Sequence, residues 1–391
     1  MKQVYLDWAS AAPVSARAKR AFMDSLQAFG NPSSPHAEGV RAARILEDSR
    51  RAIARLIGVK QDSVIFTSGA TEANNLAIIG HVMALREKDP QRAIHILYLP
   101  TMHASVTETL SALQKWGVQV EPIALKDGAI DLVALAKQVR PETALVSLDV
   151  ICGETGMRWE TRDVRRVLDQ ARAGEAGARI LLHVDVSQAP FVELIEHTHL
   201  GADLITLDAQ KVGGVRGIGA FVRANVHIPL APILHGGGQE YGLRPGTEQP
   251  ALAAAFATAL EEANSGREAF VDRALRARSL LLSLLSQSFP DMLINDGKAS
   301  APHILNLSFP GCDTDYAVML LSQKGFAVST KSACETNEEG SRAVGALFGD
   351  ADRARSTLRI SWGPTTSEKD IERFGRELVQ IIQFLIATRL Q

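Results

Sequence analysis

The sequence predicts an α/β fold, with a large domain built on a mainly parallel sheet and a smaller α+β domain after it. Between about residues 60 and 225, short apolar runs alternate with helical stretches, which is typical of a parallel sheet covered on both faces. Beyond about residue 255, long helices surround isolated strand-like runs. A chain of 391 residues also exceeds the size at which single cores stop growing. We therefore expect a large domain of residues 13–255 and a small domain of residues 1–12 with 256–391.

The predicted strands of the large domain are continuous apolar runs, as expected for strands buried on both faces. Amphipathic or apolar helical stretches separate several of them. In chain order, the predicted strands are SVIFT, AIHILYLP, TALVSLDVI, ARILLHVDV, ADLITLD and IGAFVRANV, and the helices include TEANNLAIIGHVMALREK, SVTETLSALQKWG and TRDVRRVLDQARAG.

The small domain is predicted to hold a long helix (SGREAFVDRALRARSLLLSLLSQS) and two strands (HILNLSFP and TLRISW). Ser367 precedes a closing helix with one apolar stripe. The residues of this stripe follow a three-and-four spacing: Ile371, Phe374, Leu378, Ile381, Ile382 and Leu385.

The composition argues against nucleic-acid binding, membrane binding and secretion. A net charge of −2 gives no sign of the positive charge that binding to nucleic acid or an anionic membrane requires. Three cysteines are too few for a disulfide framework and favour a reducing setting, so we expect a cytoplasmic protein. The N-terminus lacks the apolar core of a signal peptide, and the uncharged stretches fall short of a membrane span. No metal site is expected.

Polar residues follow several predicted strands, where ligands bind in open α/β sheets. In the run Ser68–Thr71, Gly69 permits a tight turn, so the amides of Ala70 and Thr71 could face an anion at a helix start. Helix capping by Ser68 or Thr71 is an equal alternative.

Four further side chains follow strands in the same way. Asp185 ends a buried run and Gln188 follows it, although both could serve a helix cap. Lys211 precedes a glycine-rich tract and could be either a solvated charge or an imine-forming amine. His103 could stack on a flat ring, relay protons as a catalytic residue or be structural. Together, an amide cradle, an acid, an amide, a histidine and a lysine suit pyridoxal 5′-phosphate, a planar phosphorylated aldehyde.

The sequence resembles the cysteine desulfurases of the class V aminotransferase fold (the pyridoxal-phosphate-dependent transferase fold type I) almost from end to end. No single motif is decisive, but the following eight occur in the family's order: YLDWASAAP, FGNPSSPHAEG, FTSGATEANNLAI, HVDVSQA, DAQKVGGVRGIGA, HGGGQEYGLRPGT, KSAC and TLRISWG.

The resemblance implies a role for each residue named above. Lys211 would join the cofactor covalently, Asp185 would pair with its ring nitrogen, Gln188 would bond the ring hydroxyl, His103 would stack on the ring, and Ala70 and Thr71 would hold its phosphate. Thr247 would reach the phosphate of a neighbouring subunit, which implies a homodimer. Arg359 would bind the substrate carboxylate, as its bidentate fork allows.

The resemblance also identifies Cys334 as the nucleophile. Its thiolate would take sulfur from L-cysteine, leaving a persulfide and L-alanine, after Lys211 removes the α-proton. The polar, acidic context of Cys334 is unlike a buried core, whereas Cys152 and Cys312 are expected to pack passively. An acceptor must then receive the sulfur, either a scaffold for iron–sulfur cluster assembly or a tRNA-modification carrier, and the sequence does not say which.

Three positions depart from the family pattern. Asp208 stands where serine is usual and Gln210 where histidine is usual, and both positions normally contact the phosphate. A carboxylate beside a phosphate is repelled unless it turns away, is protonated or is bridged by a cation. Gly153 replaces an asparagine expected near the ring hydroxyl and substrate carboxylate. These departures predict a rewired phosphate site.

Alternative functions remain open on the sequence. A selenocysteine lyase of the same fold would carry the same residues, whereas a plain aminotransferase needs no thiol nucleophile. A non-catalytic dimeric scaffold would explain the departures around Lys211, but not the joint presence of Asp185, His103, Arg359 and Cys334.

Overall fold

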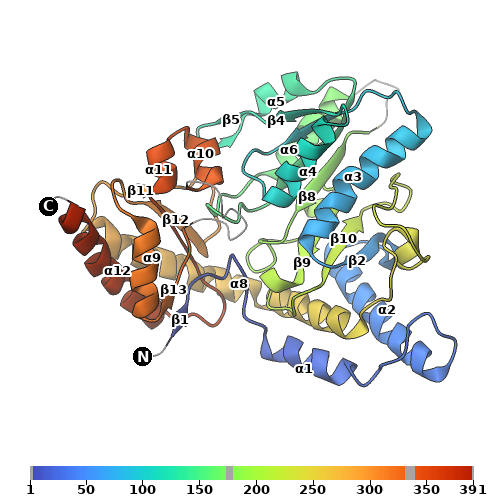
Figure 1. Cartoon of the computed structure of the whole chain (residues 1–391), viewed down its shortest axis with the longest axis horizontal. Helices are drawn as coiled ribbons and strands as arrows, with labels where there is room; N and C mark the ends of the chain where they lie inside the picture. The colour runs from blue at the N-terminus through green and yellow to red at the C-terminus, as the bar shows by residue number, and fades with distance from the viewer. Residues whose placement is uncertain (1–2, 173–178, 331–339, 390–391) are drawn as a thin grey trace.

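A computed structural model describes residues 3–172, 179–330 and 340–389 of the chain (Figure 1). Seven strands form the central sheet in the order β2-β10-β9-β8-β7-β3-β4. The parallel strands are β3 (His95–Tyr98), β4 (Gln119–Pro122), β7 (Thr143–Asp149), β8 (Leu181–Asp185) and β9 (Leu204–Asp208). Strand β10 (Gly219–Arg223) runs antiparallel to β9 and to β2 (Val64–Thr67). The α/β class and the mainly parallel sheet are thus confirmed.

The helices of the large domain pack on both sides of this sheet. Figure 1 shows α3 and α4 on one side of strands β2, β9 and β10, and α1 and α2 on the other. The helices of this part of the chain, in order, are α1 (Ala16–Ser25), α2 (Ala37–Ile57), α3 (Ala70–Lys88), α4 (Ala104–Gln114), α5 (Leu132–Gln138), α6 (Thr161–Ala171) and α7 (His197–Leu200). A short hairpin of β5 (Leu125–Lys126) and β6 (Ala129–Ile130) precedes α5.

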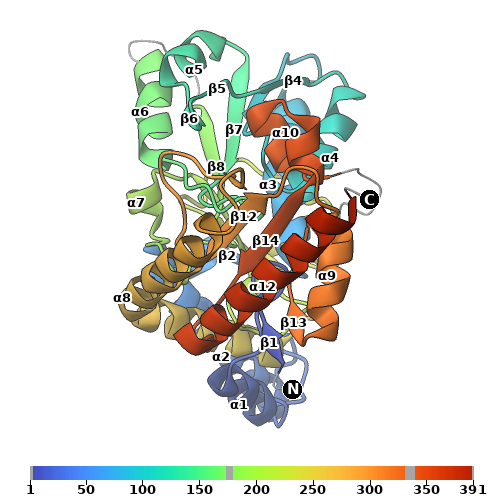
Figure 2. The ribbon, with the colours of Figure 1, turned by 90° about the vertical axis from the view of Figure 1, so that its left-hand side faces the viewer.

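The C-terminal part forms a second layer of strands and helices. Strand β12 (Ile304–Ser308) pairs antiparallel with both β11 (Leu293–Ile294) and β14 (Thr357–Ser361). Figure 2 shows α12 lying across β14 with α9 beside it. The helices of this part are α9 (Thr314–Gln323), α10 (Arg342–Phe348), α11 (Ala351–Arg355) and α12 (Glu368–Arg389). All six predicted stripe residues of α12 are buried.

The N-terminal segment is hydrogen-bonded to strands of this C-terminal layer. Strand β1 (Val4–Tyr5) pairs parallel with β13 (Phe326–Ala327), and the Leu6 carbonyl accepts from the Ser361 amide. Residues 4–6 therefore lie with the C-terminal strands β13 and β14, and the chain then continues to α1.

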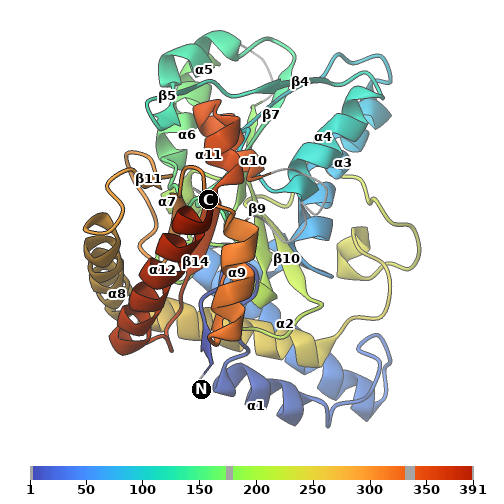
Figure 3. The ribbon, with the colours of Figure 1, turned by 60° about the vertical axis from the view of Figure 1, so that its left-hand side comes forward.

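Helix α8 (Pro250–Ser286) is longer than the sequence periodicity predicts, since we expected a helix only from residue 265. Its first part is alanine-rich and starts with proline at a position where the missing N–H costs nothing. Figure 3 shows α8 running from beneath the large domain to the neighbourhood of α12. The predicted domain boundary near residue 255 falls inside this helix and stays a prediction. Within the described residues, none of the helices combines the length and apolar character needed to cross a bilayer.

Candidate active site

A pocket of about 310 Å³ lies where strands β7, β8 and β9 end. Thr247 is exposed and does not line this pocket of its own chain, and Cys334 lies outside the described residues. The other predicted site residues all line it: Ala70, Thr71, His103, Gly153, Asp185, Gln188, Asp208, Gln210, Lys211 and Arg359.

The parallel sheet explains why acidic residues meet here. Asp149, Asp185 and Asp208 are the last residues of three adjacent strands, and Asp149 pairs in register with Asp185. Parallel strands bring their carboxyl ends to one edge, and residues in register point to the same face. Three carboxylates therefore surround one cavity.

Lys211 ends a short 3₁₀ turn (η2, Ala209–Lys211) that follows β9 directly. Its Nζ donates to the carbonyl oxygens of Ala9, at 2.8 Å, and Ser10, at 2.7 Å. Gln188 Nε2 donates to the same Ala9 carbonyl at 2.9 Å. The N-terminal segment thus holds the amine at the pocket, a non-local contact that no local sequence pattern indicates.

A hydrogen-bond chain links Asp185 to His103 through two residues that the sequence reasoning missed. Asn74 Nδ2 donates to Asp185 Oδ2 and to Ser105 Oγ, both at 2.9 Å, and Asn74 is fully buried. Ser105 Oγ lies 2.9 Å from His103 Nδ1, which also accepts from the Ser105 amide at 3.1 Å. Because Nδ1 accepts, the neutral imidazole carries its proton on Nε2.

Burial sets the charge of His103. Removal from water lowers its pKa below the ordinary value, the nearby Asp185 carboxylate partly opposes this, and Lys211 and Arg342 lower the pKa further. His103 is consequently a neutral ring at pH 7, which suits stacking on a flat ligand.

Asp149 is a further pocket residue that the sequence reasoning missed, although it ends an apolar run as Asp185 does. It is buried, and its Oδ1 has no hydrogen-bond partner among the described residues. Burial and repulsion by Asp185 raise its pKa well above the usual range. Asp149 therefore holds a proton more readily than an ordinary carboxyl does.

The N-terminus of α3 faces the pocket, but Asp208 occupies it. The Ala70 amide donates to Asp208 Oδ2 at 3.4 Å, a long contact, and Gln210 Nε2 donates to the same oxygen at 3.2 Å. Gly219 of β10 packs against the Gly69 backbone so closely that a Cβ there would come within 2.7 Å. The start of α3 therefore bonds to a carboxylate of the chain itself.

Glu72 also holds the start of α3 in place. Its carboxylate accepts from the Ser68 amide at 2.7 Å and pairs with Arg244 at 3.0 Å. Burial raises the pKa of Glu72, but these hydrogen bonds outweigh it and hold the pKa below the usual value. Arg244 lies in the predicted motif that carries Thr247, so this ion pair connects that motif to the cradle.

Arg359, on β14, is buried and points its guanidinium toward the pocket. Nη2 donates to Asp7 Oδ1 at 2.8 Å and to Ser10 Oγ at 2.6 Å, and Nη1 donates to the Gly153 carbonyl at 3.0 Å. A Cβ at Gly153 would lie 3.1 Å from Gln188 Nε2, so glycine leaves room for that amide. Asp7 and Ser10 were not predicted as site residues.

The described residues Ser329 and Ser341, on either side of residues 331–339, both contact residues that line the pocket. Ser329 forms a two-residue bridge with Arg359, and the Arg359 amide donates to the Ser329 carbonyl at 2.6 Å. On the other side, Ser341 Oγ donates to Glu154 Oε2 at 2.5 Å. The residues that flank 331–339 therefore contact two residues that line the pocket.

Comparison with known proteins identifies the family. The profile of the family Aminotransferase class-V matches residues 4–374. Cysteine desulfurase IscS 1 of Archaeoglobus fulgidus is 31% identical over 387 residues, covering 97% of both chains. Cysteine desulfurase IscS of Pectobacterium carotovorum is 33% identical over 384 residues, covering 96% of this chain and 92% of that relative.

Solved structures agree. A NifS-like protein superposes with a TM-score of 0.89 at 28% identity, covering 98% of this chain and all of that one. DndA from Streptomyces lividans gives a TM-score of 0.74 at 30% identity, covering 90% and 97% of the two chains. The chain therefore belongs to the class V aminotransferases, a pyridoxal-phosphate-dependent family, and within them to the cysteine desulfurases.

Proposed function

We propose that the pocket binds pyridoxal 5′-phosphate and that the chain transfers sulfur from L-cysteine to Cys334, releasing L-alanine. The observation that carries this proposal is the meeting of Lys211, Asp185, His103 and Arg359 around one pocket of about 310 Å³. The residues fit the group: an amine for its aldehyde, a buried carboxylate for its pyridine nitrogen, a neutral ring for its face and a helix start for its phosphate.

The cofactor supplies an electron sink that stabilises negative charge at the substrate α-carbon. Lys211 would hold the aldehyde and, once released, accept the α-proton on Nζ. Asp185, fixed by Asn74 and the Ser187 amide at 2.9 Å each, would keep the proton on the ring nitrogen. Gln188 would bond the ring hydroxyl.

Arg359 orients the substrate in this proposal. Its guanidinium already binds the Asp7 carboxylate, so the substrate carboxylate would share or replace that partner in a bidentate pair. Glycine at 153 supplies no side-chain donor, which leaves Arg359 as the principal carboxylate ligand on this wall of the pocket.

The sulfur transfer needs Cys334 as a thiolate. Its Sγ would bond to the substrate sulfur while the substrate carbon–sulfur bond breaks, and the carbon would then be protonated to give alanine. The persulfide on Cys334 would pass to an acceptor, for which an iron–sulfur scaffold and a tRNA-modification carrier are the two candidates.

The site as described is completed by a second subunit in this proposal. Thr247 is exposed, and several apolar side chains near α1, α2 and the same loop region are also exposed: Met23, Leu26, Phe29, Val40 and Tyr241. Phe29 is 81% exposed, which is unusual for a large apolar side chain and supports a self-association surface. A homodimer would cover these residues and bring Thr247 to the partner's phosphate.

The deciding experiment supplies L-cysteine and a thiol reductant and follows alanine and sulfide. We expect Cys334→Ala to lower turnover by roughly a thousandfold or more while the protein keeps its visible cofactor band. Lys211→Ala should lose that band, and Cys312→Ala, which alters a buried cysteine that does not line the pocket, serves as the matched control. Full turnover in Cys334→Ala would exclude the mechanism, and activity on L-selenocysteine alone would indicate a selenocysteine lyase.

A further inference from the structure

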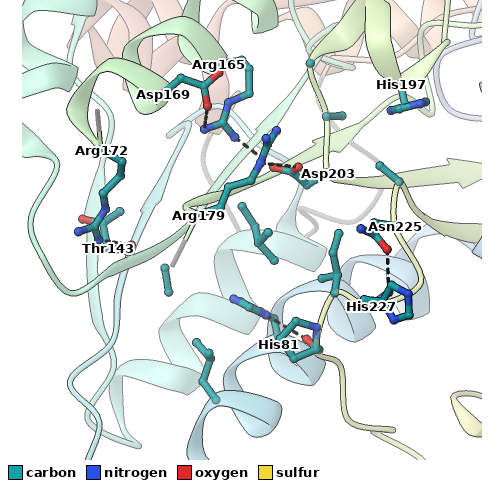
Figure 4. Close-up of a pocket in the computed structure, with 18 of the residues that line it drawn as sticks. His81, Thr143, Arg165, Asp169, Arg172, Arg179, His197, Asp203, Asn225 and His227 are labelled. Atoms are coloured by element: carbon teal, nitrogen blue, oxygen red, sulfur yellow. Dashed lines mark hydrogen bonds and ion pairs between the residues drawn. The ribbon is translucent and has the colours of Figure 1, made fainter. Parts of the chain in front are cut away.

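A second, larger cleft of about 940 Å³ lies at the opposite edge of the central sheet (Figure 4). Its lining includes Thr143 and Leu181, at or next to the starts of β7 and β8, and Asp203, which directly precedes β9. The same three strands end at the active pocket. Strands of this length separate the two sites by about 15–20 Å, so the cleft is no part of the catalytic site.

The cleft is strongly basic, whereas the whole chain carries a net charge of −2. Among the described residues, its lining includes five arginines and two acidic residues. The charged residues are Arg92, Arg162, Arg165, Arg172, Arg179, Asp169 and Asp203, and the histidines are His81, His197 and His227.

Two of the arginines are fixed on a buried carboxylate. Asp203 binds Arg165 Nη1 at 3.1 Å and Arg179 Nε at 2.9 Å, and it also accepts from the Leu182 amide at 2.9 Å. Arg165 is 4% exposed, donates to the Ile180 carbonyl at 2.9 Å and also pairs with Asp169 at 2.7 Å, so its role in the cleft is to hold Asp203 and Asp169 in place. The guanidinium groups are thus held in place before any ligand arrives, which lowers the entropic cost of binding.

Two other arginines of the cleft, Arg92 and Arg162, have no carboxylate partner among the described residues, whereas Arg172 donates to the Pro141 carbonyl at 2.7 Å. Among the described residues, no ion pair or hydrogen bond joins the guanidinium of Arg92 or Arg162, although the Arg92 amide donates to the Asp89 carbonyl at 3.1 Å. Figure 4 shows Arg165, Arg172 and Arg179 on one side of the space and His81 and His227 on the other. Uncompensated positive charges facing a shared space attract an anion and focus its field.

We propose that this cleft binds a small anion with two or three phosphate groups. Guanidinium forks match phosphate oxygens in a bidentate geometry, and several arginines around one space suit several phosphates. A cleft of about 940 Å³ is large for a single phosphate and lies in the range of small-molecule sites. Phenylalanine, tyrosine and tryptophan are absent from its described lining, so the phosphates rather than a stacked base supply the affinity.

The test is calorimetric titration of the chain, saturated with pyridoxal phosphate, with inorganic tripolyphosphate. We expect one saturable site per chain that weakens as salt rises. The double variant Arg92→Glu/Arg162→Glu should bind roughly a hundredfold more weakly, since each lost charged hydrogen bond is worth about tenfold or more. The matched control Arg17→Glu/Arg44→Glu changes the net charge equally on exposed arginines of α1 and α2 and should bind within about threefold of wild type.

The single variants Arg92→Gln and Arg162→Gln remove one charge each and should each lose roughly tenfold, which keeps the test valid if the double variant misfolds. Equal losses in both double variants would show only a diffuse field and overturn the proposal. No saturable binding, or displacement of tripolyphosphate by a glutamate decapeptide of higher affinity, would overturn it as well. Desulfurase turnover is not the readout, so the outcome is independent of the proposed function.

Discussion

At the scale of single residues, the unusual feature of the pocket is the carboxylate of Asp208 at the start of α3. The Ala70 amide and the Gln210 side chain both donate to it, so the chain satisfies its own anion site. A phosphate dianion must displace this carboxylate or lie beside it, and the like charges repel. We therefore expect Asp208 to lower the affinity of the chain for the cofactor.

Asp208→Ser should raise the affinity for pyridoxal phosphate by roughly tenfold or more, because it removes a competing charge and leaves a hydroxyl donor. The measurement is cofactor retention during dialysis, followed by the visible absorbance of wild type and variant. Equal retention in the two proteins would show that Asp208 does not weaken the site.

Asn74 is the residue whose two amide hydrogens position both Asp185 and, through Ser105, His103. Asn74→Ala should lower kcat by roughly tenfold and shift the pH at which the cofactor band changes, because Asp185 loses a donor. Asn75→Ala is the matched control, since Asn75 is the next residue of α3 and bonds to Thr71 and Thr109 instead. A variant with lower stability but an unshifted spectral titration would contradict the positioning role.

At the scale of elements, side chains of three neighbouring strands are joined across the sheet. His183 of β8 lies 2.8 Å from Ser147 Oγ of β7 through Nδ1 and 3.1 Å from Thr206 Oγ1 of β9 through Nε2. Complete burial lowers the pKa of His183 to about 4, with Asp185 partly opposing this. The ring is therefore held neutral in the folded chain.

Stability should fall as the pH falls from about 6.5 to about 4. Below the unfolded-state pKa, the unfolded chain binds a proton at His183 that the folded chain excludes, so the free energy of unfolding decreases by an amount on the order of 3 kcal/mol. Thermal unfolding between pH 4 and 7.5 measures this, with His183→Asn expected to flatten the slope. The exposed His235→Gln is the control, and an identical slope in all three proteins would contradict the assignment.

The elements themselves show what local pattern can predict. The predicted apolar stripe of α12 is confirmed. It could be predicted because a helix that buries one face repeats its apolar residues with the helical period, whichever element packs against that face. The antiparallel direction of β10 was not predicted, since an apolar run reads the same in either direction. The early start of α8 was missed because alanines buried against α1 and α2 give little periodic contrast.

Only some of the residues that line the pocket could be predicted from the sequence. Residues directly after strands could be found from the sequence, because parallel strands bring those positions together. Ala9, Ser10 and Asp7 could not, since their contacts with Lys211 and Arg359 span 201 to 352 residues of sequence. Asp149 ends a buried apolar run as Asp185 does, so it could have been predicted as a site residue, but it was overlooked.

At the scale of the whole molecule, the proposed shared site makes a prediction about mixed dimers. Lys211→Ala and Thr247→Glu should each be inactive alone, the second because its carboxylate repels the partner's phosphate. Co-expressed, they should recover about a quarter of wild-type activity, since half of the dimers are hybrids with one intact site. Activity is measured on tagged, purified mixtures.

Mixing the same variants after separate purification, without subunit exchange, is the control and should give no recovery. Co-expressed mixtures that stay inactive would show that Thr247 does not serve the site of another chain.

Helix α8 has a consequence for how the protein can be divided. It extends for about 55 Å and contacts α1 and α2 with its first part and α12 with its second. A cut after residue 255 would leave a six-residue piece of α8 on one fragment and would remove Phe256 and Leu260 from the interior of that fragment. Separately expressed halves should therefore be insoluble, and a protease that nicks surface loops should leave the nicked pieces associated as one particle.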